Sequence, residues 1–83
     1  MIEIITSISV ITFDSRVLEF FRSKGETYRY HVKLIRKIEL ETTRRGQRLT
    51  MEYTDSRMPV QFGIEDGAVT QVEELIDAVR SAM

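Results

Sequence analysis

Residues 67–83 decide the fold, and their sequence is GAVTQVEELIDAVRSAM. Apolar residues recur in this segment at helical spacing, so they share one stripe of an α-helix, whereas Glu73, Glu74 and Asp77 lie off that stripe. The pattern predicts a helix over residues 67–81 whose apolar side must cover another apolar surface. The stripe consists of Ala68, Val72, Leu75, Ile76 and Val79.

Short apolar runs precede this helix and alternate with polar residues at the period of two that is typical of half-buried strands. The first run is either one bent strand or a pair of strands. We expect strands over residues 2–11, 17–22, 26–32, 34–42, 47–53 and 58–63.

Alternation also assigns the two faces of the later strands. In residues 34–42 the aliphatic face is predicted to be core, which places Ile35 on the outer face. The same rule gives inward sets in the two strands that follow. The predicted inward residues are Leu34, Ile38 and Leu40, with Arg36 on the same side, then Leu49, Met51 and Tyr53, and finally Met58, Val60 and Phe62.

Turn signals separate the predicted strands. Gly25 ends the loop at residues 23–25, where a glycine can supply the positive φ that a three-residue hairpin loop often needs. Residues 43–46 (TRRG) are expected to form the next hairpin turn, and residues 54–57 a polar turn before Pro59.

Composition places the chain among single-domain globular proteins. It has 83 residues, of which 42% are hydrophobic and 30% charged. It has no cysteine, so disulfides and thiolate metal sites are excluded and a reducing, cytoplasmic compartment is expected. A core this small gives marginal stability unless self-association contributes.

The N-terminal segment is apolar but carries Glu3 and no basic leader, so we expect it to be part of the fold and not a signal or transit peptide. No uninterrupted apolar segment reaches the roughly 18 to 20 residues needed to cross a bilayer. Any membrane role is therefore expected to be peripheral, with no transmembrane segment.

Five to seven short antiparallel strands followed by one C-terminal helix resemble the pleckstrin-homology-like (PH-like) superfold, especially its small bacterial members. The resemblance covers nearly the whole chain and is carried by residues 11–14, 17–20 and 32–40 and by the helix from Val69 to Val79. It implies an α+β fold in which an antiparallel barrel, reduced or partly open because the chain is short, is closed by the helix. The competing architecture is a plain α+β sheet with the helix packed on one face.

The resemblance also implies a binding scaffold and not an enzyme, because such domains present loops to lipid headgroups or lay peptides along a barrel edge. Phosphoinositide-binding members place a basic cluster around their first hairpin, a Lys followed by a Lys/Arg-x-Arg set. Here Arg22, Lys24 and Arg29 surround the predicted turn at residues 23–25, with one basic residue of the expected pair present. These three residues are candidate ligand contacts.

Charge is divided unevenly along the chain. Between residues 16 and 48 there are ten Lys or Arg against four Glu, whereas from residue 61 onward one Arg faces five acids. Arg44, Arg45 and Arg48 cluster at a predicted hairpin tip, where exposed Arg can bind phosphate or attract an anionic surface. The alternative is a solvated turn that keeps a strand edge from aggregating.

Few residues are suited to catalysis. His31 is the only histidine, so a Ser-His-Asp arrangement would depend on it alone, and a solvated strand histidine is the favoured interpretation. The carboxylate pairs Glu39/Glu41 and Glu65/Asp66 fit sheet-surface and helix-start charges better than an acid-base dyad or a hard-metal site. The glycines form neither a GxGxxG nor a Walker pattern. We therefore expect no enzyme activity, no metal and no cofactor.

Adjacent Phe20 and Phe21 indicate a surface for self-association. Neighbouring strand residues point to opposite faces, so these two residues and Val17 cannot all face inward unless the strand twists or bulges. A second copy of the chain could cover the apolar surface that remains exposed.

These observations favour a non-catalytic module that binds a protein partner or self-associates through a sheet edge or the basic hairpin. The alternative function is peripheral binding of an acidic membrane lipid or a phosphorylated ligand through the three hairpin arginines. Nucleic acid binding is not favoured, because the net charge is -1 and Tyr28 and Tyr30 are expected to face inward with Val32.

Overall fold

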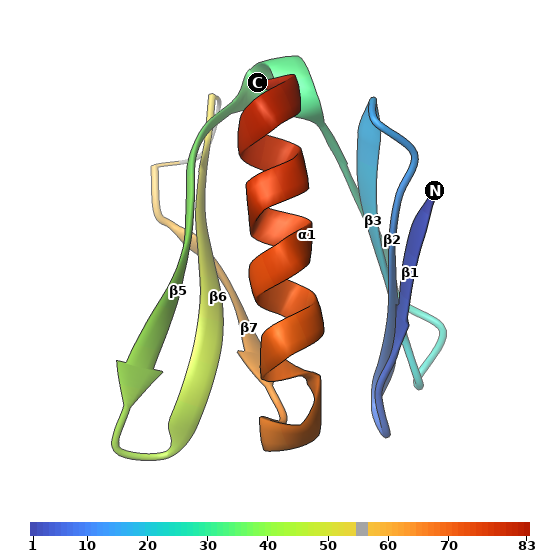
Figure 1. Ribbon diagram of the computed structural model, residues 1–83, viewed down its shortest axis with the longest axis vertical. Coiled ribbons are helices and arrows are strands. Elements are labelled where there is room, and N and C mark those ends of the chain that lie inside the picture. Colours follow the sequence, from blue (N-terminus) through green and yellow to red (C-terminus); the bar gives the residue numbers. More distant parts are fainter. Residues whose placement is uncertain (55–56) are drawn as a thin grey trace.

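The computed structural model shows two antiparallel sheets and one α-helix in the residues that it describes (Figure 1). The structure describes residues 1–54 and 57–83. The described strands are β1 (Ile2–Ile5), β2 (Ser9–Phe13), β3 (Val17–Arg22), β4 (Thr27–His31), β5 (Ile35–Thr43), β6 (Gly46–Tyr53) and β7 (Val60–Ile64). The helical elements are the short 3-10 turns η1 (Val32–Leu34) and η2 (Asp66–Ala68) and the helix α1 (Val69–Ala82).

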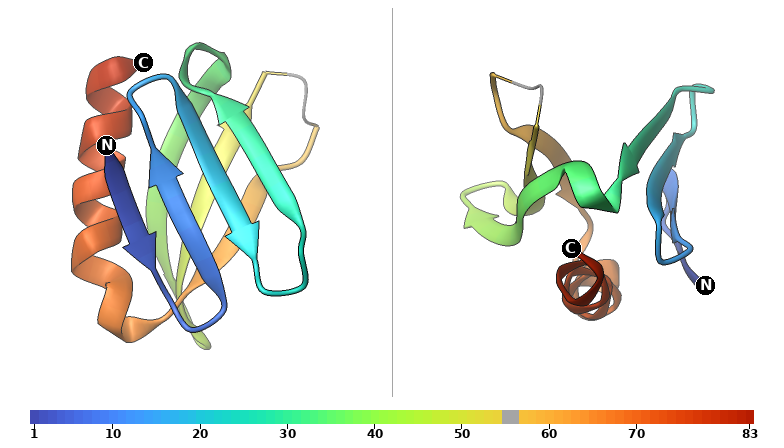
Figure 2. Two further views of the ribbon diagram at one scale, coloured as in Figure 1. Left: turned by 90° about the vertical axis from the view of Figure 1, so that its right-hand side faces the viewer. Right: turned by 90° about the horizontal axis from the view of Figure 1, so that it is seen from above.

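Within each sheet, strands pair with their neighbours in the chain. Sheet one has the order β1-β2-β3-β4 and sheet two the order β5-β6-β7. In Figures 1 and 2, α1 runs along the side of the molecule where β1 and β5 lie. The predicted α+β class with a C-terminal helix is confirmed, while the described strands form two separate sheets and not a closed barrel.

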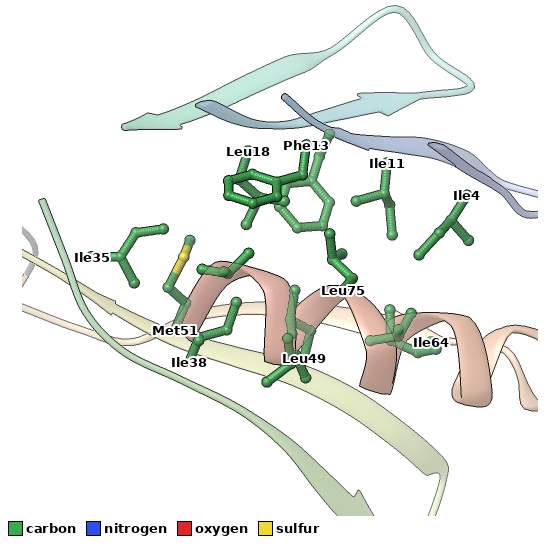
Figure 3. Packing of buried hydrophobic residues seen from close by; sticks show 14 of the residues in the cluster. Ile4, Ile11, Phe13, Leu18, Ile35, Ile38, Leu49, Met51, Ile64 and Leu75 are labelled. Atoms are coloured by element: carbon green, nitrogen blue, oxygen red, sulfur yellow. The ribbon is translucent and has the colours of Figure 1, made fainter. Parts of the chain in front are cut away.

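The helix follows the predicted stripe. It begins at Val69 and not at residue 67, because the preceding residues form η2, and it ends at Ala82. The predicted apolar stripe is confirmed, since Ala68 and four residues of α1 are buried. Figure 3 shows Leu75 of α1 pointing into the same core as side chains from both sheets.

The apolar run over residues 2–11 is a pair of strands, which is one of the two alternatives expected for it. The chain turns at residues 6–8, where the Thr6 N–H donates to the Ser9 carbonyl at 2.9 Å and the Ser9 N–H donates to the Thr6 hydroxyl at 3.0 Å. Polar side chains at this point therefore supply a hairpin turn within an apolar run. After the turn, β2 continues two residues beyond the predicted end, to Phe13.

The sequence analysis assigned Ile35, at the start of β5, to the wrong face of the strand. The register shifts between Ile35 and Lys37, which marks a β-bulge, so Ile35 and Ile38 are both buried. Leu34 belongs to η1 and is 42% exposed, contrary to its predicted inward position. From Lys37 onward the alternation is as predicted, and Leu40 packs against the core.

The last strand also begins later than predicted. Met58 precedes Pro59, lies before β7 and is 76% exposed, so its predicted inward position was wrong. Val60 and Phe62 pack against the core as predicted, and the strand ends at the buried Ile64. The polar turn predicted for residues 54–57 includes two residues, Asp55 and Ser56, that are outside the described residues.

The remaining predicted strands agree with the structure within about a residue at each end. They are β3, β4 and β6. Gly25 adopts the expected positive φ, at +88°, and Gly46 has φ +122°. Ser15, in the turn between β2 and β3, has φ +80° without being a glycine.

Away from α1, aromatic side chains join the two sheets. Phe20 stacks on Phe62 with ring centroids 3.9 Å apart and planes only 4° from parallel. Tyr30 meets Tyr53 edge-on at 5.2 Å, and Tyr28 meets Phe62 at 5.7 Å. We call these five residues the aromatic seam. It connects β3 and β4 of sheet one to β6 and β7 of sheet two through side chains.

Candidate interaction sites

The β5–β6 hairpin divides its three arginines between two roles. Arg44 and Arg45 are exposed at the tip and form no ion pair within the described residues. Arg48 instead donates from Nε and Nη2 to Glu41 Oε2, at 3.0 and 2.8 Å. These hydrogen bonds lower the pKa of the Glu41 carboxyl. The predicted three-residue site is therefore a two-residue tip beside an ion pair.

The β3–β4 turn likewise separates its predicted basic residues. Arg22 and Lys24 are exposed and line a surface hollow of about 330 Å³ together with the exposed Ile8. Arg29 is three residue pairs further along the hairpin, where its Nε donates to Glu19 Oε2 at 3.0 Å. The structure thus brings Arg22 and Lys24 together and holds Arg29 in an ion pair of its own.

The two basic turns belong to different sheets. Figure 1 places both toward the end of the molecule where α1 begins, with the β5–β6 turn on one side and the β3–β4 turn on the other. No hydrogen bond or ion pair links them among the described residues.

Other residues singled out from the sequence have structural contacts. Exposed His31 accepts from the Lys33 N–H at Nδ1, at 3.2 Å, and thereby caps η1. Glu65 accepts from the Ser7 N–H at 2.6 Å and from its hydroxyl at 2.9 Å. Nowhere in residues 1–54 and 57–83 do three or more His, Asp or Glu side chains form a group able to hold a metal ion.

A groove between β5 and α1 was not predicted from the sequence. Its volume is about 370 Å³, and Figure 1 shows the two elements separating toward the hairpin end of β5. The exposed lining is mainly polar, with two apolar residues, Leu40 and the largely buried Ile76, among the charged ones. The lining residues are Glu39, Leu40, Glu73, Ile76, Asp77 and Arg80.

The backbone of β5 is turned toward this groove. Arg80 donates from Nε and Nη2 to the Ile38 carbonyl, at 3.2 and 2.8 Å, so Ile38 directs its backbone away from β6. Backbone groups in an antiparallel ladder alternate in direction, so Leu40 and Thr42 also present their N–H and C=O at the edge. β5 is an edge strand of sheet two. A sequence signal existed in Arg80, although it indicated only a match to the helix dipole.

Sheet one exposes apolar side chains on the face opposite the core. Phe20 is 1% and Phe21 38% exposed, which confirms that the two adjacent residues cannot both face inward. Phe21 lies directly across from Val10, which lies across from the 71% exposed Ile5. We call Ile5, Val10 and Phe21 the apolar row; Thr27 on β4 lies next to Phe21 at its end. The adjacent charged row consists of Glu3, Thr12, Glu19 and Arg29.

No family model, curated protein or solved structure matches this chain. In the part of the chain that the structure describes, no helix combines the length and apolar character needed to span a bilayer.

Proposed function

We propose that this protein is a non-catalytic interaction module that binds an extended, basic segment of a partner protein along the edge of β5, against α1. The observation that carries the proposal is the outward-facing backbone of β5 beside a groove whose lining includes three carboxylates.

The backbone supplies the general attraction. An extended segment placed beside β5 would exchange hydrogen bonds with Leu40 and Thr42, the mode known as strand addition. Arg80 already occupies the Ile38 carbonyl, so pairing would begin beyond that residue, where β5 and α1 separate. About two to three residues of the partner would therefore pair with the free part of β5.

The side chains supply the preference for a basic segment. Glu39, Glu73 and Asp77 line the groove, and the one cation among its described lining residues, Arg80, donates to a carbonyl of β5. Alternate residues of a bound strand point in opposite directions, so one set would cover Leu40 and Ile76 while the other reached the carboxylates. Alternating Val and Lys side chains meet both demands.

The resemblance to the PH-like superfold supports the same class of function, since such domains lay peptides along a barrel edge. The seven strands in the described residues, arranged as four and three and followed by a helix, are compatible with a partly open member of that superfold. Fold analogy is the weaker support, and the groove itself is the stronger one.

The test is a titration of isotope-labelled protein with an acetylated hexapeptide of alternating Lys and Val, followed by amide chemical shifts. We expect shifts in β5 and the facing side of α1, with a dissociation constant of about 0.1 to 1 mM for so short a probe. The double variant Glu73→Lys, Asp77→Lys should weaken binding about tenfold or more. A hexapeptide of alternating Glu and Val should not bind.

The control is Glu74→Lys, which makes one such charge reversal at an exposed helix position outside the groove. Thr42→Pro removes one outward N–H at the edge and should weaken binding without loss of the fold. Shifts confined to the basic turns, or equal binding of the two hexapeptides, would contradict the proposed groove.

A second candidate function is peripheral binding to an acidic membrane through the basic turns. The favouring observation is Ile8, 49% exposed beside Arg22 and Lys24 in one hollow, since an apolar tip flanked by cations suits a membrane interface. Co-sedimentation with acidic and neutral liposomes at low and high salt tests it. Replacing Arg22, Lys24, Arg44 and Arg45 by Ser should abolish binding to acidic liposomes, whereas Arg48→Ser should have little effect because Arg48 pairs with Glu41.

A further inference from the structure

We propose that a second copy of this chain packs on the outer face of sheet one, so that two copies form a symmetric dimer. This surface is separate from the β5–α1 groove. The apolar row runs across the sheet at one level, and its two most exposed hydrophobic members are Ile5 and Phe21. Contiguous exposed apolar side chains on a sheet face are typical of a contact surface.

The charged row indicates which orientation of the second copy fits. Glu3 is at one edge of the sheet, on β1, and Arg29 is at the other, on β4. Three strand spacings of about 4.8 Å separate them, so they are too far apart to pair within one chain. Arg29 donates to Glu19 through Nε, and its two terminal nitrogens donate no hydrogen bond within the described residues.

A two-fold axis parallel to the strands joins these complementary ends. The rotation keeps each row at its own level and reverses the strand order, so β1 of one copy lies over β4 of the other. Glu3 then faces Arg29 of the second copy, twice by symmetry. In the apolar row, Val10 faces Phe21 of the second copy, again twice.

The other axis in the plane of the interface is electrostatically poorer. An axis across the strands places each strand over its own copy, so Glu3 approaches Glu3 and Arg29 approaches Arg29. It can avoid these like-charge contacts only by setting the charged row against the apolar row. Charge complementarity therefore selects the axis parallel to the strands.

The size of the face sets the expected affinity. Four strands of about five residues make a surface of roughly 15 by 17 Å, which is small beside the ~800 Å² per partner of a standard interface. The dimer is consequently weak, with a dissociation constant of about 10 to 100 μM. Association must therefore be measured up to millimolar protein.

The test is sedimentation velocity on the full chain and on two charge reversals, Glu3→Arg and Arg29→Glu, alone and mixed. Each reversal alone sets like charges against each other in both pairs, so the dissociation constant should rise about tenfold. In the mixture the charges are complementary again, so a heterodimer should form within about threefold of the parent affinity. Glu74→Arg, on the exposed side of α1, is the control and should leave association unchanged.

A further variant tests the apolar row, and far-UV circular dichroism checks that every variant is folded. Phe21→Ser should weaken association by about tenfold or more. A parent chain that is monomeric at millimolar concentration would overturn the proposal and leave the apolar row to a different occupant, such as a lipid surface. Reversals that associate as well as the parent, or a mixture no better than its components, would overturn it as well.

Discussion

The outer faces of the two sheets differ in their side chains: sheet two carries paired charges, whereas sheet one also exposes apolar residues. Sheet two pairs its outward charges with one another, since Arg48 binds Glu41 across strands at 2.8 Å and Lys37 lies near Glu39 along β5 at 3.6 Å. Sheet one places Ile5 and Phe21 at equivalent outward positions, together with one ion pair between Glu19 and Arg29. Both sheets are antiparallel meanders with one face on the same core.

The difference shows that alternation alone does not define a solvent face. An antiparallel sheet usually has one buried and one polar face, and sheet two follows this rule. Sheet one keeps the alternation but fills part of its outer face with apolar residues. Covering an exposed apolar surface removes it from water and is favourable. Covering a charged face whose side chains already pair with one another gains less.

The comparison is tested most strongly by two adjacent residues of β3. Phe20→Ala removes a ring that is 1% exposed and stacked on Phe62, so it should lower the free energy of unfolding by about 3 to 5 kcal/mol. Phe21→Ala, on the outer face, should lower it by less than about 1 kcal/mol in the monomer. Urea denaturation at low protein concentration measures both, and equal losses would show that the outer face of sheet one is also core.

The two sheets also differ in which residue adopts positive φ in a turn. Ser15 turns the chain between two strands of sheet one at φ +80°, whereas the corresponding turn of sheet two uses Gly46 at φ +122°. Ser15→Gly should therefore raise the free energy of unfolding by about 0.5 to 1 kcal/mol, because glycine adopts positive φ without strain. Gly46→Ala should lower it by about 1 kcal/mol or more. A loss of stability in Ser15→Gly would mean that the serine side chain contributes more than its backbone strain.

The ion pair of sheet two should have a small effect. Arg48→Gln should lower Tm by about 3 °C or less. The side chains of Arg48 and Glu41 are 39% and 33% exposed, so water screens their attraction. The difference from the parent should shrink further in about 1 M salt. Thermal melts at low and high salt check this. A loss of stability as large as that of Phe20→Ala would show that the outer face of sheet two contributes as much as the core.

The smallest effect concerns the contact that ties the β1–β2 turn to the segment before α1. The pKa of Glu65 is below its usual 4.5, chiefly because the Ser7 N–H donates to the carboxylate. A carboxyl with a lower pKa in the folded state adds stability that is fully present above about pH 5 and is lost as pH falls through the folded-state pKa. Glu65→Gln should therefore lose less stability than the parent between about pH 5 and pH 3.

Urea midpoints measured across this pH range give the comparison. The parent and Glu65→Gln should approach each other in stability at low pH, since the protonated carboxyl and the amide are both uncharged. Parallel pH curves would show that Glu65 is not responsible for this part of the acid response.

Much of the fold could be predicted because its periodicity persists over enough residues. The stripe from Ala68 to Val79 has one helical solution, and the alternation around Leu49 and Met51 has one strand solution, so both were correct. The assignments that were wrong or left open lie where backbone geometry changes within a run. The bulge near Ile35 and the turn at residues 6–8 depend on strand pairing, which the order of apolar residues does not specify.

The candidate sites were harder to predict for a related reason. Arg29 and Arg48 belonged to predicted basic clusters, but each pairs with a Glu directly across the strand, and that partner is known only once the register is known. Arg44 and Arg45 were placed correctly at a tip because a turn signal alone locates them. The β5–α1 groove joins segments more than 30 residues apart, so no local pattern could indicate it.

The aromatic seam gives this protein a built-in optical reporter. The chain has three tyrosines and no tryptophan, and all three tyrosines belong to the seam. Tyrosine fluorescence and near-ultraviolet circular dichroism therefore follow the contact between the sheets, whereas the far-ultraviolet signal follows the strands and the helix. If the two signals change at different denaturant concentrations, the sheets part before they unfold, and no label has to be added to observe it.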